Sequence, residues 1–349
     1  MPQERERTRL MVAVSRLYYD EQQSQQEIAE GLDVSRATVS RLLTQARSER
    51  LVQITIRNPL AGEESLEEQL VATFGLRSAA VCQTPGATDE SRLDQVADLG
   101  SATFARALAP GAVIGVTTSR AVGAVVRRCA PVASPDATIT PLLGGWSAEG
   151  CDWHANANTR NLAEKLMCGY LQCHAPAFVA SEATRAALLE ERVVARVLEM
   201  ARTCTVALVG VGQLDLDASI VRSGTFTAAD IAAVTASGAV AQVGTLFIDG
   251  QGRLVPTAFD LRSLGITAEE FRRIPTVMAV AAGRAKVEPL CAVLSGGWIH
   301  TLVTDVATAR GILDRRPQRG AAQHEAQGGC ATAARELPRW QETMRDERR

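Results

Sequence analysis

Short apolar runs alternate with helical patterns along most of the chain, and this alternation restricts the fold more than any other feature. AAVC is followed by a helical pattern at 92–108, VIGV by one at 119–129, and TITPLL by one at 156–172. Later apolar runs are VALVG, TLFID, VMAVAAG and HTLVTD. Apolar strands separated by helices indicate βαβ units and a mostly parallel sheet covered on both sides. We therefore expect an α/β domain over residues 77–313.

Changes in composition divide the rest of the 349-residue chain. The stretch NPLAG breaks the preceding pattern and an amphipathic segment follows, which predicts a linker and connecting helix over residues 58–76. Residues 1–57 are then expected to form a small separate domain. Residues 314–349 lose apolar periodicity and are predicted to be disordered. One alternative stays open there, a short helix that makes a weak contact through Leu337, Trp340 and Met344.

Composition and cysteine spacing argue against several classes of protein. No apolar run approaches the roughly 18 residues that span a bilayer, and the first ten residues lack the apolar core of a signal peptide, so we expect a cytoplasmic protein with no membrane partner. The eight cysteines include no Cys-x-x-Cys pair, which predicts reduced and mostly buried thiols. The group Cys151, His154, Cys168 and Cys173 fits no common zinc spacing, and we expect neither a metal nor a cofactor.

The N-terminal segment has the start signals and apolar spacing of three helices. Residues 9–19 place apolar side chains at helical spacing, and Ser24-Gln25-Gln26-Glu27 is a capping box that starts a short second helix. Asp33 occupies the following turn, where a positive φ is often needed and aspartate tolerates it. The alternating residues 51–56, LVQITI, predict a strand that we interpret as a wing. These features favour a winged helix-turn-helix domain.

The third helix is predicted to be the DNA-reading element. Five arginines against one acid lie between residues 35 and 57, although the whole chain has a net charge of −2. Such local positive charge neutralises DNA phosphates, and arginine pairs with guanine edges in the major groove. The alternative is an ordinary surface helix with a solvated charged face. The predicted contacts to double-stranded operator DNA are the helix cap and the outward face, namely Ser35, Arg36, Ala37, Ser40, Arg41 and Thr44.

The run SQQEIAEGLDVSRATVSRLLTQARSERLVQITI resembles the N-terminal motif of the SorC-type family of sugar-binding transcriptional regulators. The similarity continues through IGVTTSRAV, LVGVG, SGAVAQVGTLFIDGQG, AVAAGRAK and LVTDVATA, and it covers roughly residues 9–313. The resemblance implies a sensor domain similar to sugar-phosphate isomerases and deaminases, with a phosphorylated sugar at the carboxyl ends of parallel strands. Where the family usually has Gly-Asp after GAV, this chain has Ala241-Gln242.

The loop after VIGV is the predicted phosphate site. Thr117, Thr118, Ser119 and Arg120 follow a predicted strand and open a helix, so that hydroxyls, free amides and a guanidinium converge on an anion. Lys286, one of two lysines in the chain, follows a similar turn. The alternative is that the three hydroxyls only cap the helix and that Arg120 is solvated.

Asparagine and aspartate side chains complete the predicted effector site. Asn156 and Asn158 resemble a family position near the ligand, but asparagine is also a good N-cap. Asp249 and Asp305 end predicted strands, where a carboxylate either binds sugar hydroxyls or caps the next turn. We include Asn156 and Asp249 in the predicted effector site and favour a capping role for Asp305.

A transcriptional regulator of a carbohydrate pathway, controlled by a sugar phosphate, accounts best for these features. One rival is a sugar-phosphate isomerase- or deaminase-like enzyme, but the chain has four histidines and no nucleophile–base motif, so we assign no catalytic residue. The other rival is a DNA-binding oligomer without a ligand. Because one helix-turn-helix reads few bases, we expect a homo-oligomer, either a dimer or a tetramer.

Overall fold

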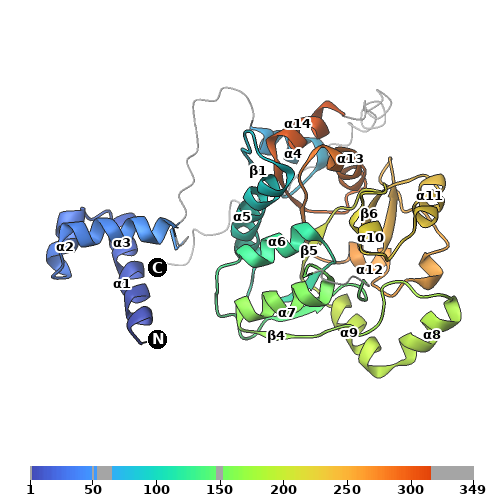
Figure 1. Ribbon diagram of the computed structural model, residues 1–349, viewed down its shortest axis with the longest axis horizontal. Coiled ribbons are helices and arrows are strands. Elements are labelled where there is room, and N and C mark those ends of the chain that lie inside the picture. The colour runs from blue at the N-terminus through green and yellow to red at the C-terminus, as the bar shows by residue number, and fades with distance from the viewer. Residues whose placement is uncertain (1, 49–50, 53–64, 147–151, 316–349) are drawn as a thin grey trace, which may run out of the picture.

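Three helices pack around a small apolar core at the start of the computed structural model, which describes residues 2–48, 51–52, 65–146 and 152–315 (Figure 1). They are α1 (Pro2–Tyr19), α2 (Gln25–Gly31) and α3 (Arg36–Ser48). Their apolar faces meet in one cluster, formed by Met11, Val14, Ile28, Ala29, Val39, Leu42, Leu43 and Ala46. We call these three helices the reading head.

The turns of the reading head follow the predicted chemistry. The Glu27 amide donates to Ser24 Oγ at 3.2 Å, and the Ser24 amide donates to the Glu27 carboxylate at 2.7 Å, which confirms the capping box. Asp33 has a φ of 53°, the left-handed conformation predicted for this turn. Of the predicted wing strand, residues 51–52 form a bend, whereas residues 53–56 lie outside the described part of the chain.

A parallel sheet forms the centre of the second domain. In the described residues it has seven strands in the order β1-β9-β8-β5-β2-β3-β4, and every neighbouring pair is parallel. The predicted α/β class is therefore confirmed. The strands are β1 (Ser78–Cys82), β2 (Val113–Val116), β3 (Thr138–Pro141), β4 (Gly169–Tyr170), β5 (Val206–Gly210), β8 (Thr276–Val280) and β9 (Thr301–Asp305).

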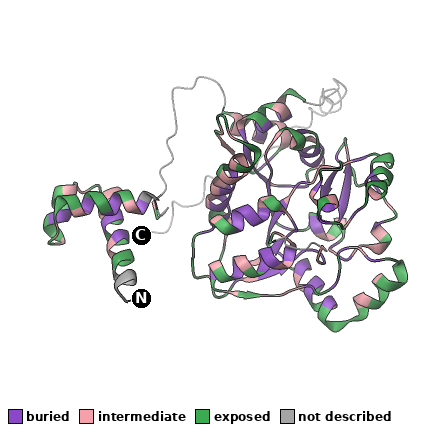
Figure 2. Cartoon of the chain, viewed as in Figure 1, coloured by how far each residue is buried: buried purple, intermediate pink, exposed green. Residues whose placement is uncertain are grey.

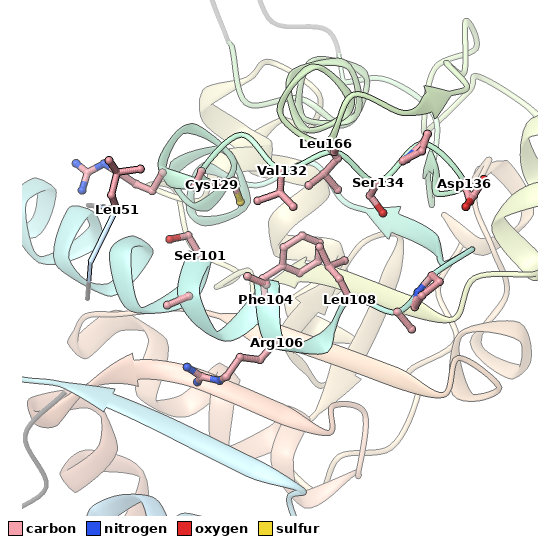
Figure 3. A pocket seen from close by; sticks show the side chains of 18 residues that line it. Leu51, Ser101, Phe104, Arg106, Leu108, Cys129, Val132, Ser134, Asp136 and Leu166 are labelled. Atoms are coloured by element: carbon pink, nitrogen blue, oxygen red, sulfur yellow. The ribbon is translucent and has the colours of Figure 1, made fainter. Parts of the chain in front are cut away.

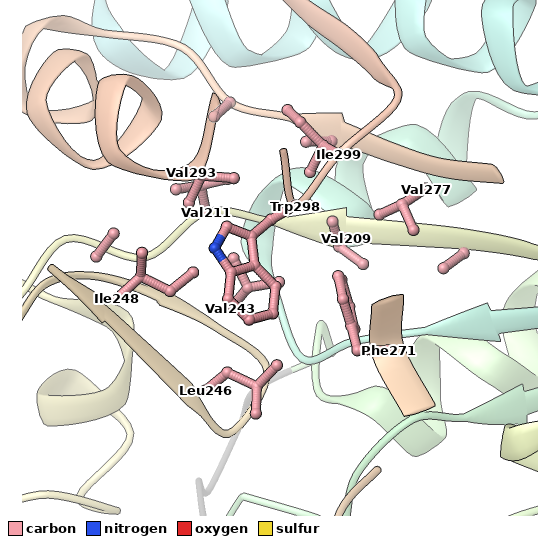
Figure 4. Close-up of a cluster of buried hydrophobic side chains, with 14 of the residues drawn as sticks. Val209, Val211, Val243, Leu246, Ile248, Phe271, Val277, Val293, Trp298 and Ile299 are labelled. Carbon is pink, nitrogen blue, oxygen red and sulfur yellow. The ribbon is translucent and has the colours of Figure 1, made fainter. Parts of the chain in front are cut away.

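Both faces of the sheet are buried under helices. Because successive residues of a strand point to opposite sides, each strand contributes side chains to both faces. On β9, Leu302 enters one apolar cluster and Val303 enters another. The first cluster lies under α4 (Leu66–Phe74), α9 (Arg192–Arg202), α13 (Val287–Ser295) and α14 (Val306–Asp314), and the second lies under α5 (Asp89–Ala107), α6 (Arg120–Arg128) and α7 (Ala155–Leu166). Figure 4 shows part of the first cluster around Trp298, and Figure 2 shows the buried sheet between helices with exposed outer faces.

At least one helix follows each strand of the parallel sheet along the chain. Helices α4 and α14 are far apart in sequence but pack side by side (Figure 1). The helices of the second domain are α4 (Leu66–Phe74), α5 (Asp89–Ala107), α6 (Arg120–Arg128), α7 (Ala155–Leu166), α8 (Glu182–Glu190), α9 (Arg192–Arg202), α10 (Ser219–Arg222), α11 (Ala228–Ala236), α12 (Ala268–Arg272), α13 (Val287–Ser295) and α14 (Val306–Asp314). Two 3-10 turns are η1 (Asp260–Arg262) and η2 (Arg284–Lys286).

Two segments differ from the simplest βαβ expectation. The run TLFID does not join the parallel sheet, because β7 (Leu246–Asp249) pairs with β6 (Ala239–Val243) in a separate antiparallel hairpin. The connecting helix α4 packs into the second domain, with Leu70 fully buried in the first cluster. Among the described helices, none combines the length and apolar character needed to cross a membrane.

The reading-head core generates the first prediction. Leu43 is fully buried between the three helices, so Leu43→Ala should leave a cavity and lower the free energy of unfolding of this domain by about 2–5 kcal/mol. Calorimetry of the full chain should show an earlier transition for the reading head and an unchanged one for the sheet domain. Val12→Ala, at a side chain that is 38% exposed on α1, is the control. Equal effects of the two substitutions would contradict the assigned core.

Candidate functional site

The outer face of α3 is polar, basic and open to solvent. Ser35 caps the helix, because its Oγ accepts the Thr38 amide at 3.1 Å. Thr44 Oγ1 donates to the Ser40 carbonyl oxygen at 3.0 Å, which keeps this side chain close to the helix. Neither Arg36 nor Arg41 forms an ion pair with another described residue. All six predicted contact residues are exposed, namely Ser35, Arg36, Ala37, Ser40, Arg41 and Thr44.

The turn after β2 is held by its own hydroxyl groups at the carboxyl end of the sheet. Thr117 Oγ1 accepts the Gly210 amide at 3.3 Å, and Thr118 Oγ1 accepts the Ala155 amide at 3.0 Å. Ser119 Oγ accepts the first amides of α6, from Ala121 at 3.1 Å and from residue 122 at 3.4 Å. Each side chain therefore positions a different segment, and only Ser119 caps the helix.

Burial separates these hydroxyls into two groups. Thr117 and Thr118 are 2% and 7% exposed, whereas Ser119 is half-buried and Arg120 is exposed. The tip of the β6–β7 hairpin lies beside Thr117, and the cavity left between them is only about 10 Å³. That space suffices for about one water molecule. The surface available to an anion thus begins at Ser119 rather than at the two threonines.

Gly210 is required by the position of Ser119. A Cβ added at Gly210 would lie 2.1 Å from Ser119 Oγ and 2.6 Å from its Cβ. The end of β5 can therefore approach the start of α6 only without a side chain. This contact joins two of the strand ends that form the site.

Lys286 lies in the 3-10 turn after β8 and is the most perturbed cation of this edge. Desolvation lowers the pKa of Lys286 to about 8; the Asp215 carboxylate opposes this shift and the Arg120 guanidinium adds to it. Within the described residues, Arg120, Arg284 and Lys286 form no ion pair. Three cations at one edge of the sheet are thus left for an anionic ligand to neutralise.

Two further charged residues were missed by the sequence analysis. Asp215 lies in the loop after β5, and its negative charge raises the pKa of Lys286. Its Oδ1 accepts the Asp217 amide at 3.0 Å. Arg92, on the first turn of α5, extends toward Gly283 at the start of the Lys286 turn. The location of Asp215 in the loop after an apolar strand could have indicated it, because such a loop begins at the carboxyl edge of the sheet. No local pattern indicated Arg92.

The predicted asparagines have internal partners. Asn156 donates from Nδ2 to the Cys173 carbonyl oxygen at 2.8 Å and accepts the Cys173 amide at 2.9 Å. Asn158 donates to the carbonyl oxygens of Thr117 and Trp153 at 3.1 and 2.9 Å. The suggestion that asparagine caps α7 is wrong, because His154 Nδ1 accepts the Ala157 amide there.

The predicted aspartates also have backbone partners. Asp305 is fully buried and accepts the Gly283 amide at 3.0 Å and the Thr308 amide at 3.1 Å, which confirms its capping role. Asp249 Oδ1 accepts the amides of Gln251 and Arg253 at 2.9 and 2.8 Å. Because Asp249 lies at the base of the β6–β7 hairpin and Thr117 meets its tip, the structure does not bring them together.

Gln242 occupies the position where the resemblance led us to expect an aspartate. Its backbone pairs with Gly212 in both directions, at 2.8 and 3.0 Å, and its Nε2 donates to the Gly244 carbonyl oxygen at 2.8 Å. Gln242 is 4% exposed and therefore attaches the hairpin to the end of β5. The Gln242 side chain therefore stabilises the hairpin, and we do not assign it to the ligand.

An exposed basic recognition helix joined to a sheet domain with a cationic strand-end edge defines a ligand-responsive DNA-binding protein. Comparison with known proteins agrees. The sugar-binding domain model Sugar-bind matches residues 58–314, and the model of Sigma-70 region 4 matches residues 5–49. The chain belongs to the SorC-type family of sugar-binding transcriptional regulators. Its matched sugar-binding domain covers most of the sequence.

Individual relatives match over nearly their whole length. The deoxyribonucleoside regulator of Bacillus subtilis is 26% identical over 89% of this chain and 99% of the relative. The sorbitol operon regulator of Klebsiella pneumoniae is 27% identical over 87% of this chain and 98% of the relative. The crystal structure of full-length SorC from Klebsiella pneumoniae superposes with a TM-score of 0.73, at 27% identity, over 88% of this chain and 98% of that one.

The contact between β5 and α6 generates the second prediction. Gly210→Ala should push against Ser119 and lower the free energy of unfolding by about 1–3 kcal/mol, since overpacking forces a local shift. Denaturant titration measures this loss. Ser119→Gly in the same chain should recover part of it by removing the clashing atoms.

Gly169→Ala is the matched control for this substitution, because nothing lies within 4 Å of a Cβ added there. A Gly210→Ala chain as stable as the Gly169→Ala chain would show that the two strand ends are not in the contact described.

Proposed function

We propose that this regulator reads double-stranded operator DNA through α3 and releases or engages it according to a phosphorylated sugar bound at the carboxyl edge of the sheet. The observation that carries the proposal is that Arg120, next to Ser119, lies close enough to Lys286 for their charges to interact, and that among the described residues Arg120, Arg284 and Lys286 form no ion pair. A dianionic phosphate there adds negative charge beside cations for which Asp215 supplies a single nearby carboxylate. A neutral sugar offers no such gain.

The internal contacts revise which predicted residues we assign to the ligand. Arg120 is exposed and Ser119 and Lys286 are partly exposed, and we assign the phosphate contact to these three residues. Thr117, Thr118 and Asn156 each bond to backbone groups of another segment, so we assign them to positioning the turn. Asp249 lies at the far end of its hairpin and is left out of the proposed contact.

Effector binding controls DNA only if the ligand prefers one arrangement of the protein. A ligand with equal affinity for DNA-competent and DNA-incompetent arrangements shifts neither. The cations follow the ends of different strands, so a shift of one strand end relative to another changes the distances between them. A phosphate that bridges the cations therefore binds best to one arrangement of these strand ends. We place this control in the cytoplasm, where a DNA-binding regulator meets both DNA and metabolites.

The α3 face generates the third prediction. Arg41→Ala should weaken binding to the operator by about 1–3 kcal/mol and relax specificity at one base pair, since an arginine that pairs with a base edge carries that much discrimination. Fluorescence anisotropy on a duplex selected by this protein from random-sequence DNA gives the affinity at physiological salt. Arg9→Ala, an exposed arginine on α1, is the control. Unchanged affinity of the Arg41→Ala chain refutes the assigned reading face.

The charge of Lys286 generates the fourth prediction. In the free protein Lys286 loses its proton as the pH rises through about 8, whereas a bound phosphate favours the charged amine and raises its pKa. Because the second pKa of a phosphate monoester is about 6, affinity for a sugar phosphate should be highest between about pH 7 and pH 8 and should fall as the pH rises above about 8. Lys286→Arg should bind without this fall, because arginine stays protonated.

Calorimetry with sorbitol, erythritol and deoxyribose, each beside its monophosphate, tests the phosphate assignment. The phosphorylated member of the cognate pair should bind more tightly, and Lys286→Ala should remove most of that difference. If an unphosphorylated polyol binds most tightly and its affinity survives Lys286→Ala, the edge is not a phosphate site. Screening the same sugar phosphates for turnover addresses the enzyme alternative, for which we expect no product.

Oligomerisation generates the fifth prediction. One reading head contacts few base pairs, so useful specificity requires at least two heads on half-sites about one helical turn, or a multiple, apart. Light scattering of the full chain should give the mass of a dimer or tetramer. A monomer both free in solution and on the selected duplex would contradict this proposal.

A further inference from the structure

A cavity in the described part of the chain lies away from the proposed effector site. It is a groove of about 760 Å³ at the amino ends of β2 and β3, bounded by the last turns of α5 and α6 and the end of α7. Figure 3 shows Phe104, Val132 and Leu166 facing the same space. We call this cavity the amino-end groove.

The walls of the amino-end groove are mainly apolar. Phe104, Leu108, Cys129 and Leu166 form much of its lining, and Val132 on its rim is 53% exposed. Leu51, after α3, also touches the rim and is 44% exposed. A volume of this size lies within the range of ligand and peptide pockets. The proposed effector and DNA functions use none of this surface.

The segment after α14 carries apolar side chains suited to such a groove. Between residues 316 and 349 the only large apolar side chains are Leu337, Trp340 and Met344, set among charged and small residues. Their spacing of three and seven residues is that of anchors on one face of a helix lying in an apolar groove. The match to the sugar-binding family ends at residue 314, so this segment lies outside the matched domain.

The chain is long enough to bring these anchors to the groove. Helix α14 ends at Asp314, and Arg315 lies beside Glu288 of α13 with 3.9 Å between the guanidinium and the carboxylate. Twenty-one residues lie between Arg315 and Leu337. Fully extended they span up to about 70 Å, more than the roughly 45 Å diameter of a domain of this size.

We propose that residues 337–344 of this chain dock in the amino-end groove, with Leu337, Trp340 and Met344 against Phe104, Leu108 and Val132. The chain's own segment is favoured as occupant because it is covalently tethered within reach, which gives it a high effective concentration. Docking covers the apolar surface that would otherwise face water. It also leaves the carboxyl edge of the sheet free for its effector.

Hydrogen exchange of the full chain tests this docking. The variant Leu337→Asp, Trp340→Asp and Met344→Asp should exchange the amides of residues 129–136 several-fold faster than the parent, because the anchors no longer cover them. The control variant Ala331→Asp, Ala333→Asp and Ala334→Asp adds the same charge to the same segment without touching the anchors, and should exchange like the parent.

A reciprocal experiment changes the groove instead. Docking should slow tryptic cleavage after Arg339, and Val132→Glu on the exposed rim should accelerate that cleavage several-fold in the full chain. Groove exchange that is the same in all three tail sequences overturns the proposal. So does groove protection that survives the anchor substitutions and rises with protein concentration, since a second copy would then be the occupant.

Discussion

Three side-chain oxygens in the turn after β2 accept backbone N–H groups from three separate segments, and the geometry of the strand-end edge depends on them. Thr117 holds the end of β5, Thr118 holds the start of α7, and Ser119 holds the start of α6. Buried hydrogen bonds of this kind are costly to break, because the amides they satisfy would remain unpaired. These hydrogen bonds therefore fix the turn relative to β5, α6 and α7, and Arg120 directly follows it.

A second turn, after β8, holds the other two cations of this edge. Lys286 and Arg284 lie in a turn whose first amide, from Gly283, is fixed by the buried carboxylate of Asp305 and by Thr308. The Asp305 carboxylate accepts hydrogen bonds from the amides of Gly283 and Thr308 and from the Thr308 hydroxyl. Desolvation then lowers the pKa of Lys286, and a positive charge held in such surroundings favours an anionic partner. The backbone hydrogen bonds fix the two turns, and the turns present cations that form no ion pair with described residues. This combination suits a ligand site.

Local sequence chemistry predicted the elements that depend on neighbouring residues. The capping box at Ser24 and the left-handed Asp33 arise from contacts within one turn, and the buried parallel strands appear as continuous apolar runs. Predictions failed where distant partners decide the outcome. TLFID has the composition of a central strand, yet it pairs with β6 in a hairpin that Gln242 attaches to β5. Asn156 is a residue type that commonly caps helices, yet its side chain forms hydrogen bonds with the backbone of Cys173.

The sequence by itself determined the two-part architecture, the exposed polar and basic face of α3 and the presence of hydroxyls and cations at strand ends, because capping and apolar periodicity are local properties. Only the tertiary structure decided which of those groups face solvent. Thr117 and Arg120 are three residues apart, but one is buried against β5 and the other is exposed. Burial and hydrogen-bond partners depend on segments about 40 to 90 residues away, such as Ala155 and Gly210, which no local pattern specifies.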